Sequence, residues 1–194
     1  KIITKPLKHM NNTWMHILKI SFGMEALAFF TKLEGYGPSG IAVLVEALTD
    51  NRNRTIQDVR RLFTRHGCSL GESGCVSWLF ESRGVITVES NASDAEEIAL
   101  LAIDAGAEDV KTEKDYVEIY TKPEDLEKVR KVIEGNEHVI SAELSLTPQT
   151  TVLLEENKAV QALNFLDELE GLDDVQRVFS NIDFSEATLE KLRS

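Results

Sequence analysis

Residues 49–67, TDNRNRTIQDVRRLFTRHG, turn the chain from a predicted buried strand into a predicted helix, and the other elements can be placed from there. The preceding run, residues 41–48, is almost wholly apolar and contains β-branched residues, which predicts a strand covered on both faces. Apolar residues at helical spacing then form one stripe on a helix that begins near Thr55, and Gly67 is a typical residue to end it. The stripe consists of Ile56, Val59, Leu62 and Phe63.

Arginine side chains gather around this predicted helix. Arg52 and Arg54 lie in the turn beside its N-terminus, while Arg61 and Arg65 lie one turn apart on the side opposite the apolar stripe. A helix N-terminus has unpaired N–H groups and the positive end of the dipole, so guanidinium groups beside it could hold a phosphate. The sequence therefore predicts a contact with phosphate or nucleic acid here.

The short polar side chains between the strand and the helix are expected to form the turn and the helix cap, because they can bond nearby backbone N–H groups. They are Asp50, Asn51 and Asn53. Pairing on the surface is an alternative use of the arginines, since Arg54 could pair with Asp50 and Arg61 with Asp58. Both interpretations stay open at this point.

The net charge of −12 is unevenly distributed along the 194 residues. Residues 1–83 hold 11 Lys and Arg against 7 Asp and Glu, whereas residues 84–194 hold 10 against 26. A local basic patch can still act in an acidic protein, because the Debye length is about 8 Å at physiological salt. We therefore expect any nucleic-acid contact to lie in the N-terminal half.

Several function classes lack support in the sequence. Cys68 and Cys75 are too few for a secreted disulfide scaffold, so reduced thiols in an intracellular, cytoplasmic protein are expected. With His66 they do not give the spacing of a zinc site, and no metal or other cofactor is expected. No uncharged apolar run reaches 18 residues, which predicts no membrane span. HExxH and GxSxG motifs are absent, so we expect a protein that is not an enzyme.

Residues 35–40, GYGPSG, match the letters of the dinucleotide fingerprint GxGxxG. The fingerprint follows a strand and opens a helix, whereas this stretch precedes a predicted strand, and Pro38 removes one backbone donor. We interpret the stretch as a tight turn.

Residues 1–32 are predicted to form a basic, helical N-terminal segment. Residues 1–24 contain four lysines and no Asp or Glu. Apolar residues spaced by three and four predict a helix over 13–30. Lys5 and Lys8 are candidate nucleic-acid contacts. We favour a basic tail over the alternative, a remnant of a transit segment for the mitochondrion or chloroplast.

Residues 84–147 show strand and helix signals in the order βαββαβ, which is the ferredoxin-like arrangement. Each predicted helix follows a capping-box spacing, Ser93 with Glu96 and Thr121 with Glu124. The strands are expected at residues 84–89, 107–113, 116–121 and 140–146.

Tyr116 and Tyr120 stand on one face of the predicted hairpin. They could serve as a stacking platform for bases, but we favour packing within the protein.

The elements on either side of this ferredoxin-like unit complete each other. The strand at 41–48, the arginine helix and a returning strand at 75–80 make half of an α/β sandwich. After Pro148, a leucine-bearing helix and a strand at 173–181 supply the missing half, and Ser185 is expected to cap a last short helix. The fold class is therefore α+β, with a domain of residues 84–147 inserted into a discontinuous domain of residues 33–83 and 148–194.

Four stretches of the sequence closely resemble the YebC/PmpR family, in consistent order from about Leu33 to the C-terminus. They are EGYGPSG at 34–40, DNRNRT at 50–55, AGAED at 105–109 and LDDVQ at 172–176. The hexapeptide DNRNRT is the most specific of them. The resemblance implies an α+β fold of three domains, in which a ferredoxin-like domain lies inside a second α/β domain. Residues 1–32 depart from the family, whose members begin with a basic helical domain.

The same resemblance implies a transcriptional regulator that binds DNA, with translational activation or ribosome association, and so RNA, as the alternative. The residues expected to contact nucleic acid are Asn51, Arg52, Asn53, Arg54, Arg61, Arg65, Lys5 and Lys8. A second alternative is an assembly or small-molecule-sensing module, because ferredoxin-like domains often pair by their sheets or edges. A homodimer is included in that alternative.

Overall fold

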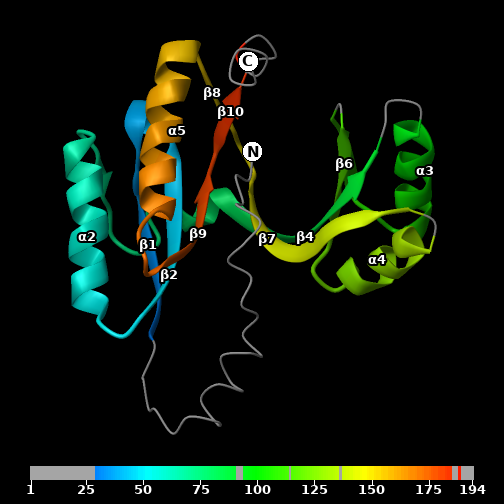
Figure 1. Cartoon of the computed structure of the whole chain (residues 1–194), viewed down its shortest axis with the longest axis horizontal. Helices are drawn as coiled ribbons and strands as arrows, with labels where there is room; N and C mark the ends of the chain where they lie inside the picture. Colours follow the sequence, from blue (N-terminus) through cyan, green and yellow to red (C-terminus); the bar gives the residue numbers. More distant parts are fainter. Residues whose placement is uncertain (1–28, 91–93, 114, 136, 185–187, 189–194) are drawn as a thin grey trace, which may run out of the picture. The chain divides into compact units, whose positions relative to one another are not determined.

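The computed structural model describes residues 29–90, 94–113, 115–135, 137–184 and 188 (Figure 1). It has the predicted mixed α+β architecture. The chain divides into two compact units: the first runs to Leu79 and resumes at Pro148, and the second is Phe80–Thr147. Each unit has its own sheet and its own hydrophobic core.

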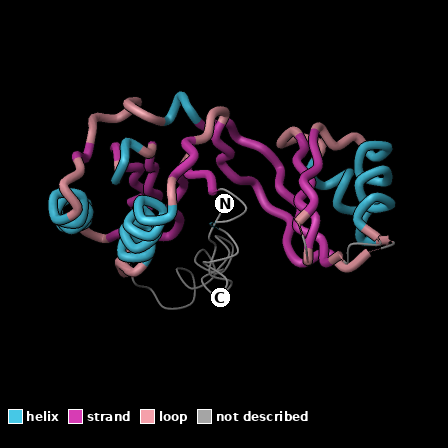
Figure 2. The backbone as a smooth tube through the Cα atoms, turned by 90° about the horizontal axis from the view of Figure 1, so that it is seen from above, coloured by secondary structure: helices cyan, strands magenta, loops and turns pink. Residues whose placement is uncertain are grey.

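The first unit contains a four-stranded antiparallel sheet in the order β3-β1-β2-β9 and a short parallel pair, β8 with β10. Helices α2 and α5 lie side by side on one face of the four-stranded sheet (Figure 2). Its elements are β1 (Phe29–Tyr36), η1 (Pro38–Gly40), β2 (Ala42–Thr49), α2 (Arg52–Arg65), β3 (Ser69–Leu70), η2 (Ser77–Leu79), β8 (Val152–Leu154), α5 (Glu156–Glu170), β9 (Val175–Ser180) and β10 (Ile182–Phe184).

Two phenylalanines join the helices of the first unit to its sheet. Phe63 of α2 and Phe165 of α5 are fully buried, with ring centroids 4.9 Å apart in an edge-to-face arrangement. Gly35 and Gly37 make room for these rings: a Cβ on Gly35 would lie 2.6 Å from Phe63 Cε1, and one on Gly37 would lie 3.0 Å from Phe165 Cε1. The tight turn predicted for residues 35–40 is confirmed from Gly37 on, with Gly40 at φ 77°, whereas Gly35 and Tyr36 belong to strand β1.

Strand β1 replaces the C-terminal end of the helix predicted over residues 13–30. The strand begins at Phe29 and pairs with β2 from Phe29↔Thr49 to Tyr36↔Ala42. The helix prediction was wrong at residues 29 and 30, which begin a strand in which buried Thr31 and Leu33 alternate with exposed Lys32. The rest of the predicted helix, residues 13–28, lies outside the described residues.

The strand predicted at residues 75–80 was also wrong, except at Phe80. Residues 77–79 form the 3-10 turn η2, and the strand β4 begins only at Phe80. The carboxylate of Glu34 accepts hydrogen bonds from the backbone N–H groups of Gly74, Val76 and Ser77, at 2.9, 3.0 and 2.8 Å. Since those donors are already used, this loop cannot join a sheet ladder.

The second unit has the βαββαβ order and a sheet in the order β5-β6-β4-β7, which is the ferredoxin-like arrangement. Residues Ile86, Val88, Val117 and Ile119 form the core with the two helices. The elements are β4 (Phe80–Glu89), α3 (Ala95–Ala105), β5 (Asp109–Thr112), β6 (Tyr116–Thr121), α4 (Leu126–Glu134) and β7 (Val139–Pro148).

Local details of the second unit differ from the predictions at the helix starts. The capping box at Thr121 and Glu124 is not formed, because Asp125 is the N-cap of α4 and the Thr121 hydroxyl donates to the carbonyl of Lys122. Ser93 lies outside the described residues, as does Ser185. Tyr120 is buried and donates to Glu118 Oε2 at 2.6 Å, which confirms packing for this ring.

Candidate nucleic-acid interface

The start of α2 is set by the three residues before it. Asn51 is the N-cap, and its side-chain oxygen accepts a hydrogen bond from the backbone N–H of Arg54 at 3.2 Å. The backbone N–H of Asn51 in turn donates to Thr49 Oγ1 at 3.0 Å. The predicted cap is confirmed for Asn51, and the helix begins three residues earlier than expected, at Arg52. Arg52 and Arg54 therefore lie in the first helical turn.

Asp174, which precedes β9, ties the C-terminal part of the first unit to this helix start. Its carboxylate accepts hydrogen bonds from Thr55 Oγ1 at 2.6 Å, Thr49 Oγ1 at 3.1 Å and Arg54 Nη2 at 3.1 Å. The hydrogen bond from Thr55 lowers the pKa of Asp174 most; Arg54 and Thr49 lower it further, against the opposing effect of burial. The carboxylate is thus held ionised at a site where its side chain is only 21% exposed.

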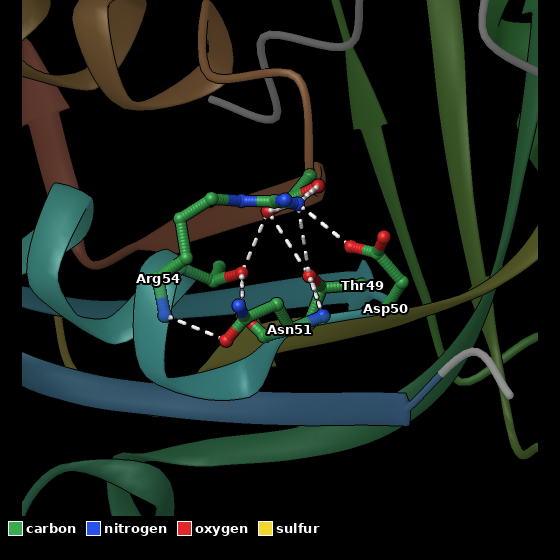
Figure 3. A network of polar contacts seen from close by, with 6 residues as sticks. Thr49, Asp50, Asn51 and Arg54 are labelled. Carbon is green, nitrogen blue, oxygen red and sulfur yellow. Dashed lines mark hydrogen bonds and ion pairs between the residues drawn. The ribbon is translucent and has the colours of Figure 1, made fainter.

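Arg54 is bound by carboxylates of its own chain. Besides Asp174 it contacts Asp50, with Nη2 2.8 Å from Oδ1 (Figure 3). The alternative pairing of Arg54 with Asp50 is thereby confirmed. All of these contacts use Nη2, so this end of the guanidinium is engaged within the protein and Arg54 helps to position the helix start.

The remaining arginines of α2 point away from the sheet. Arg61 pairs with Asp58 at 3.1 Å, which confirms the second alternative pairing, and Arg65 pairs with Glu168 of α5 at 2.8 Å. Both guanidinium groups are well exposed. Arg52 and Arg60 are exposed too, and neither forms an ion pair with another residue that the structure describes. A shallow hollow on this side of α2, here called the outward face, is lined by Gln57, Arg60, Arg61, Thr64 and Arg65.

The structure brings the predicted arginines together on one helix, but it gives them different roles. Arg52 and Asn53 are exposed at the first turn, while the side chain of Asn51 is used as a cap. Lys5 and Lys8 lie outside the described residues. Arg60 was not among the residues expected to contact nucleic acid, but it is exposed and lines the outward face.

Sequence reasoning also missed Asp174 as a partner of the helix start. The sequence LDDVQ does not show which of its two aspartates, Asp173 or Asp174, contacts α2. Its three partners lie 119 to 125 residues earlier in the chain, beyond the range of any local pattern.

Other kinds of site find no support in the described part of the chain. No group of three or more His, Cys, Asp or Glu side chains there could hold a metal ion. None of the helices described is long and apolar enough to cross a membrane. Cys68 and Cys75 are both free thiols.

The fold and site define a class of α+β protein that combines a ferredoxin-like unit, a discontinuous α/β unit and one helix with five of the nine arginines. A family model described as the second and third domain of TACO1/YebC matches residues 30–182. This chain belongs to that family, so the resemblance found in the sequence is confirmed.

Named relatives and a solved structure agree with this assignment. A protein of Dehalococcoides mccartyi named "Probable transcriptional regulatory protein DET0444" is 54% identical over 163 residues, which cover 84% of this chain and 65% of that protein. A protein of Syntrophus aciditrophicus named "Probable transcriptional regulatory protein" is 45% identical over 160 residues, with 82% and 64% covered. The crystal structure of a conserved hypothetical protein, Aq1575, from Aquifex aeolicus superimposes with a TM-score of 0.75 at 43% identity, covering 82% of this chain and 66% of that one. This chain thus spans slightly less than two thirds of the length of these relatives.

Proposed function

We propose that this chain is a non-enzymatic regulator of gene expression that binds the backbone of DNA along the outward face of α2. The observation that carries the proposal is the placement of arginine: α2 holds five of the nine arginines in the chain, with Asp58 as its one acid. Arginine is well suited to phosphate, because its planar fork can make two hydrogen bonds to one group. The names of the relatives, which call them transcriptional regulators, make DNA the first ligand to test.

The ion pairs on the outward face do not block this contact. Exposed ion pairs such as Arg61 with Asp58 stabilise a protein by roughly 0–1 kcal/mol, so a phosphate can replace the carboxylate at little cost. Binding of phosphates also releases counterions from the nucleic acid, which favours the complex at low salt. Arg52, Arg60, Arg61 and Arg65 are the proposed phosphate contacts.

Other residues expected to take part have subsidiary places in this proposal. Asn53 and the lysines Lys5 and Lys8 would add contacts near the start of α2 and from the N-terminal segment. Asn51 and Arg54 would act as positioning residues, since the first caps the helix and the second is bound to Asp50 and Asp174.

The proposal is tested by fluorescence anisotropy of a labelled 20-base-pair DNA duplex titrated with the full chain at several salt concentrations. With three or four phosphates contacted, the logarithm of the binding constant should fall against the logarithm of salt with a slope of about −3. A slope near zero would contradict phosphate contacts.

The outward face is tested by the double variant Arg61→Ala with Arg65→Ala. Each arginine removed should make the slope shallower by about 1. Arg130→Ala is the matched control, because Arg130, like Arg61, pairs with an acid three residues earlier on a helix, Glu127 at 3.0 Å, and lies in the acidic second unit. Equal losses in the double variant and the control would exclude α2 as the interface.

The same titration with a duplex RNA and a single-stranded RNA separates the two regulatory roles. Tighter binding to DNA supports a transcriptional role, whereas tighter binding to RNA supports the translational alternative. Absence of binding to any of the three at low salt would leave the assembly or small-molecule-sensing alternative.

A further inference from the structure

Two aromatic side chains of the first unit meet on the surface at one backbone carbonyl. Tyr36, the last residue of β1, donates its hydroxyl to the carbonyl oxygen of Cys75 at 3.3 Å, and Trp78 of η2 donates its indole Nε1–H to the same oxygen at 3.1 Å. Trp78 is 67% exposed and Tyr36 is 45% exposed. A tryptophan this exposed lies outside the hydrophobic core of its unit, so packing does not account for its position.

Hydrogen bonds to Glu34 fix the loop that carries Trp78. The Glu34 carboxylate accepts the backbone N–H groups of Gly74, Val76 and Ser77, and the Gly71 N–H donates to the Glu34 carbonyl at 2.7 Å. Val76 is fully buried, which further anchors the loop. Little conformational entropy would therefore be lost when a partner binds the two rings.

The hydrogen bonds of Tyr36 and Trp78 use only the polar edges of the rings. Each side chain keeps a large exposed fraction beyond these edges, and an aromatic face carries negative charge density that attracts a cation, most strongly in tryptophan. The pair thus has the chemistry of a cation-binding surface.

The charge of the stretch that carries Trp78 also favours a cation. No lysine or arginine occurs from His66 to Leu79, and Glu72 is the exposed acid of this stretch. Glu34 and Glu72 both lie near Cys75, because their negative charges add to burial in raising the pKa of its thiol. A phosphate backbone would be repelled here, whereas a guanidinium or ammonium group would be attracted.

We propose that Tyr36, Trp78 and Glu72 form a docking site for a basic segment of a partner protein, with an arginine or lysine side chain over the rings and its charge balanced by Glu72. This surface is separate from the outward face of α2 and does not depend on it. Unpaired bases, which also stack on aromatic rings, are the competing occupant that the charges disfavour.

The experiment uses the full chain with Trp14→Phe, which leaves Trp78 as the only tryptophan of the original two. An acetylated hexa-arginine peptide should shift or quench the Trp78 emission, while an oligouridylate should leave it unchanged at the same concentration. Quenching by the oligouridylate without any response to the peptide would overturn the proposal in favour of single-stranded RNA.

Variants locate the binding by anisotropy of a labelled form of the same peptide. Trp78→Leu should weaken binding about tenfold and Glu72→Gln about threefold, whereas Trp78→Phe, which keeps a ring, should retain most of the affinity. Leu100→Ala is the matched control, because Leu100 is 70% exposed in the acidic second unit. Equal affinity of wild type and Trp78→Leu would overturn the proposal. Unchanged unfolding midpoints of the variants would show that any loss of affinity comes from the surface itself.

Discussion

The Asp174 carboxylate engages one arginine of α2 within the protein and leaves the others exposed. It binds Thr49, Arg54 and Thr55 together, so Arg54 completes an internal network while Arg61 and Arg65 keep exposed pairs. The arginine-rich stretch shows its cationic character in the sequence, but the division of roles depends on a partner 120 residues away. Local reasoning could therefore find the cluster without finding which guanidinium is engaged.

Asp174→Asn should destabilise the first unit. The amide cannot accept from all three donors and loses the charge that Arg54 faces, and a hydrogen bond to a charged group is worth about 1.5–3 kcal/mol. We expect a loss of about 2–3 kcal/mol in the free energy of unfolding, measured by urea denaturation at pH 7. Asp173→Asn, at the exposed neighbouring position, should change it by less than about 0.5 kcal/mol. Similar losses in the two variants would contradict the role given to Asp174.

Glu34 should make stability depend on pH in the acid range. Burial alone would raise its pKa, but the backbone N–H groups of Gly74, Val76 and Ser77 outweigh burial and lower the pKa below its ordinary value of 4.5. A carboxylate with a lowered folded pKa stabilises the protein above its unfolded pKa, and this stabilisation is lost as pH falls through the folded pKa.

The test compares wild type with Glu34→Gln in urea between pH 7 and pH 3. The wild type should be more stable by about 2–3 kcal/mol at pH 7, and the difference should shrink below about pH 4.5. A difference that is constant over this range would show that the ionised carboxylate is not what holds the loop.

At the scale of elements, the spacing between β1 and α2 depends on a glycine. Gly35→Ala would place a Cβ 2.6 Å from Phe63 Cε1 and 2.7 Å from the carbonyl oxygen of Ser69. Because the backbone oxygen cannot move aside freely, we expect a loss of about 1–3 kcal/mol, measured by thermal or urea unfolding.

Gly171→Ala in the same unit is the control for Gly35→Ala. Gly171 ends α5 with φ −70°, and a Cβ there would lie no closer than 3.4 Å to any atom outside its chain neighbours. This variant should be neutral or more stable by up to about 1 kcal/mol. If the two variants had the same free energy of unfolding, the close contact of Gly35 with Phe63 would not determine the spacing between β1 and α2.

Element prediction succeeded where pattern and local chemistry agreed. Helix α2 has an apolar stripe, an Asn cap and a following glycine, and strand β6 alternates cleanly, so both were placed well. Strand β1 was missed because Gly35 interrupts its apolar face and Glu34 places an acid on the other face: the glycine leaves room for Phe63, and the glutamate is buried to bind the loop. Both residues serve contacts that are made only after the whole unit has assembled.

At the scale of the whole molecule, charge and hydrophobic packing are divided between the two units. The second unit holds 17 Asp and Glu against 7 Lys and Arg, while the arginine helix belongs to the first unit. Their cores share no residue.

We therefore expect the units to respond separately to changes in their cores. Val59→Ala should speed amide hydrogen exchange in α2, α5 and the first sheet and leave β4–β7 unchanged, while Ile119→Val should do the opposite. Both side chains are fully buried, and the expected losses are about 2–4 kcal/mol for Val59→Ala and about 1 kcal/mol for Ile119→Val. Mass spectrometry of peptides gives the readout. Faster exchange throughout the chain after either change would indicate one cooperative unit.

The pairing of β2 with β9 also sets an order for folding during synthesis. Val43 pairs with Ser180 and Val45 with Val178, so the sheet of the first unit is incomplete until the ribosome has made β9, more than 120 residues after β2. Residues 80–147 are contiguous, and their strands and helices can assemble as soon as they emerge. Until β9 arrives, the apolar edge of β2 is open to other nascent strands, which makes this edge the point of greatest exposure to aggregation and to chaperones.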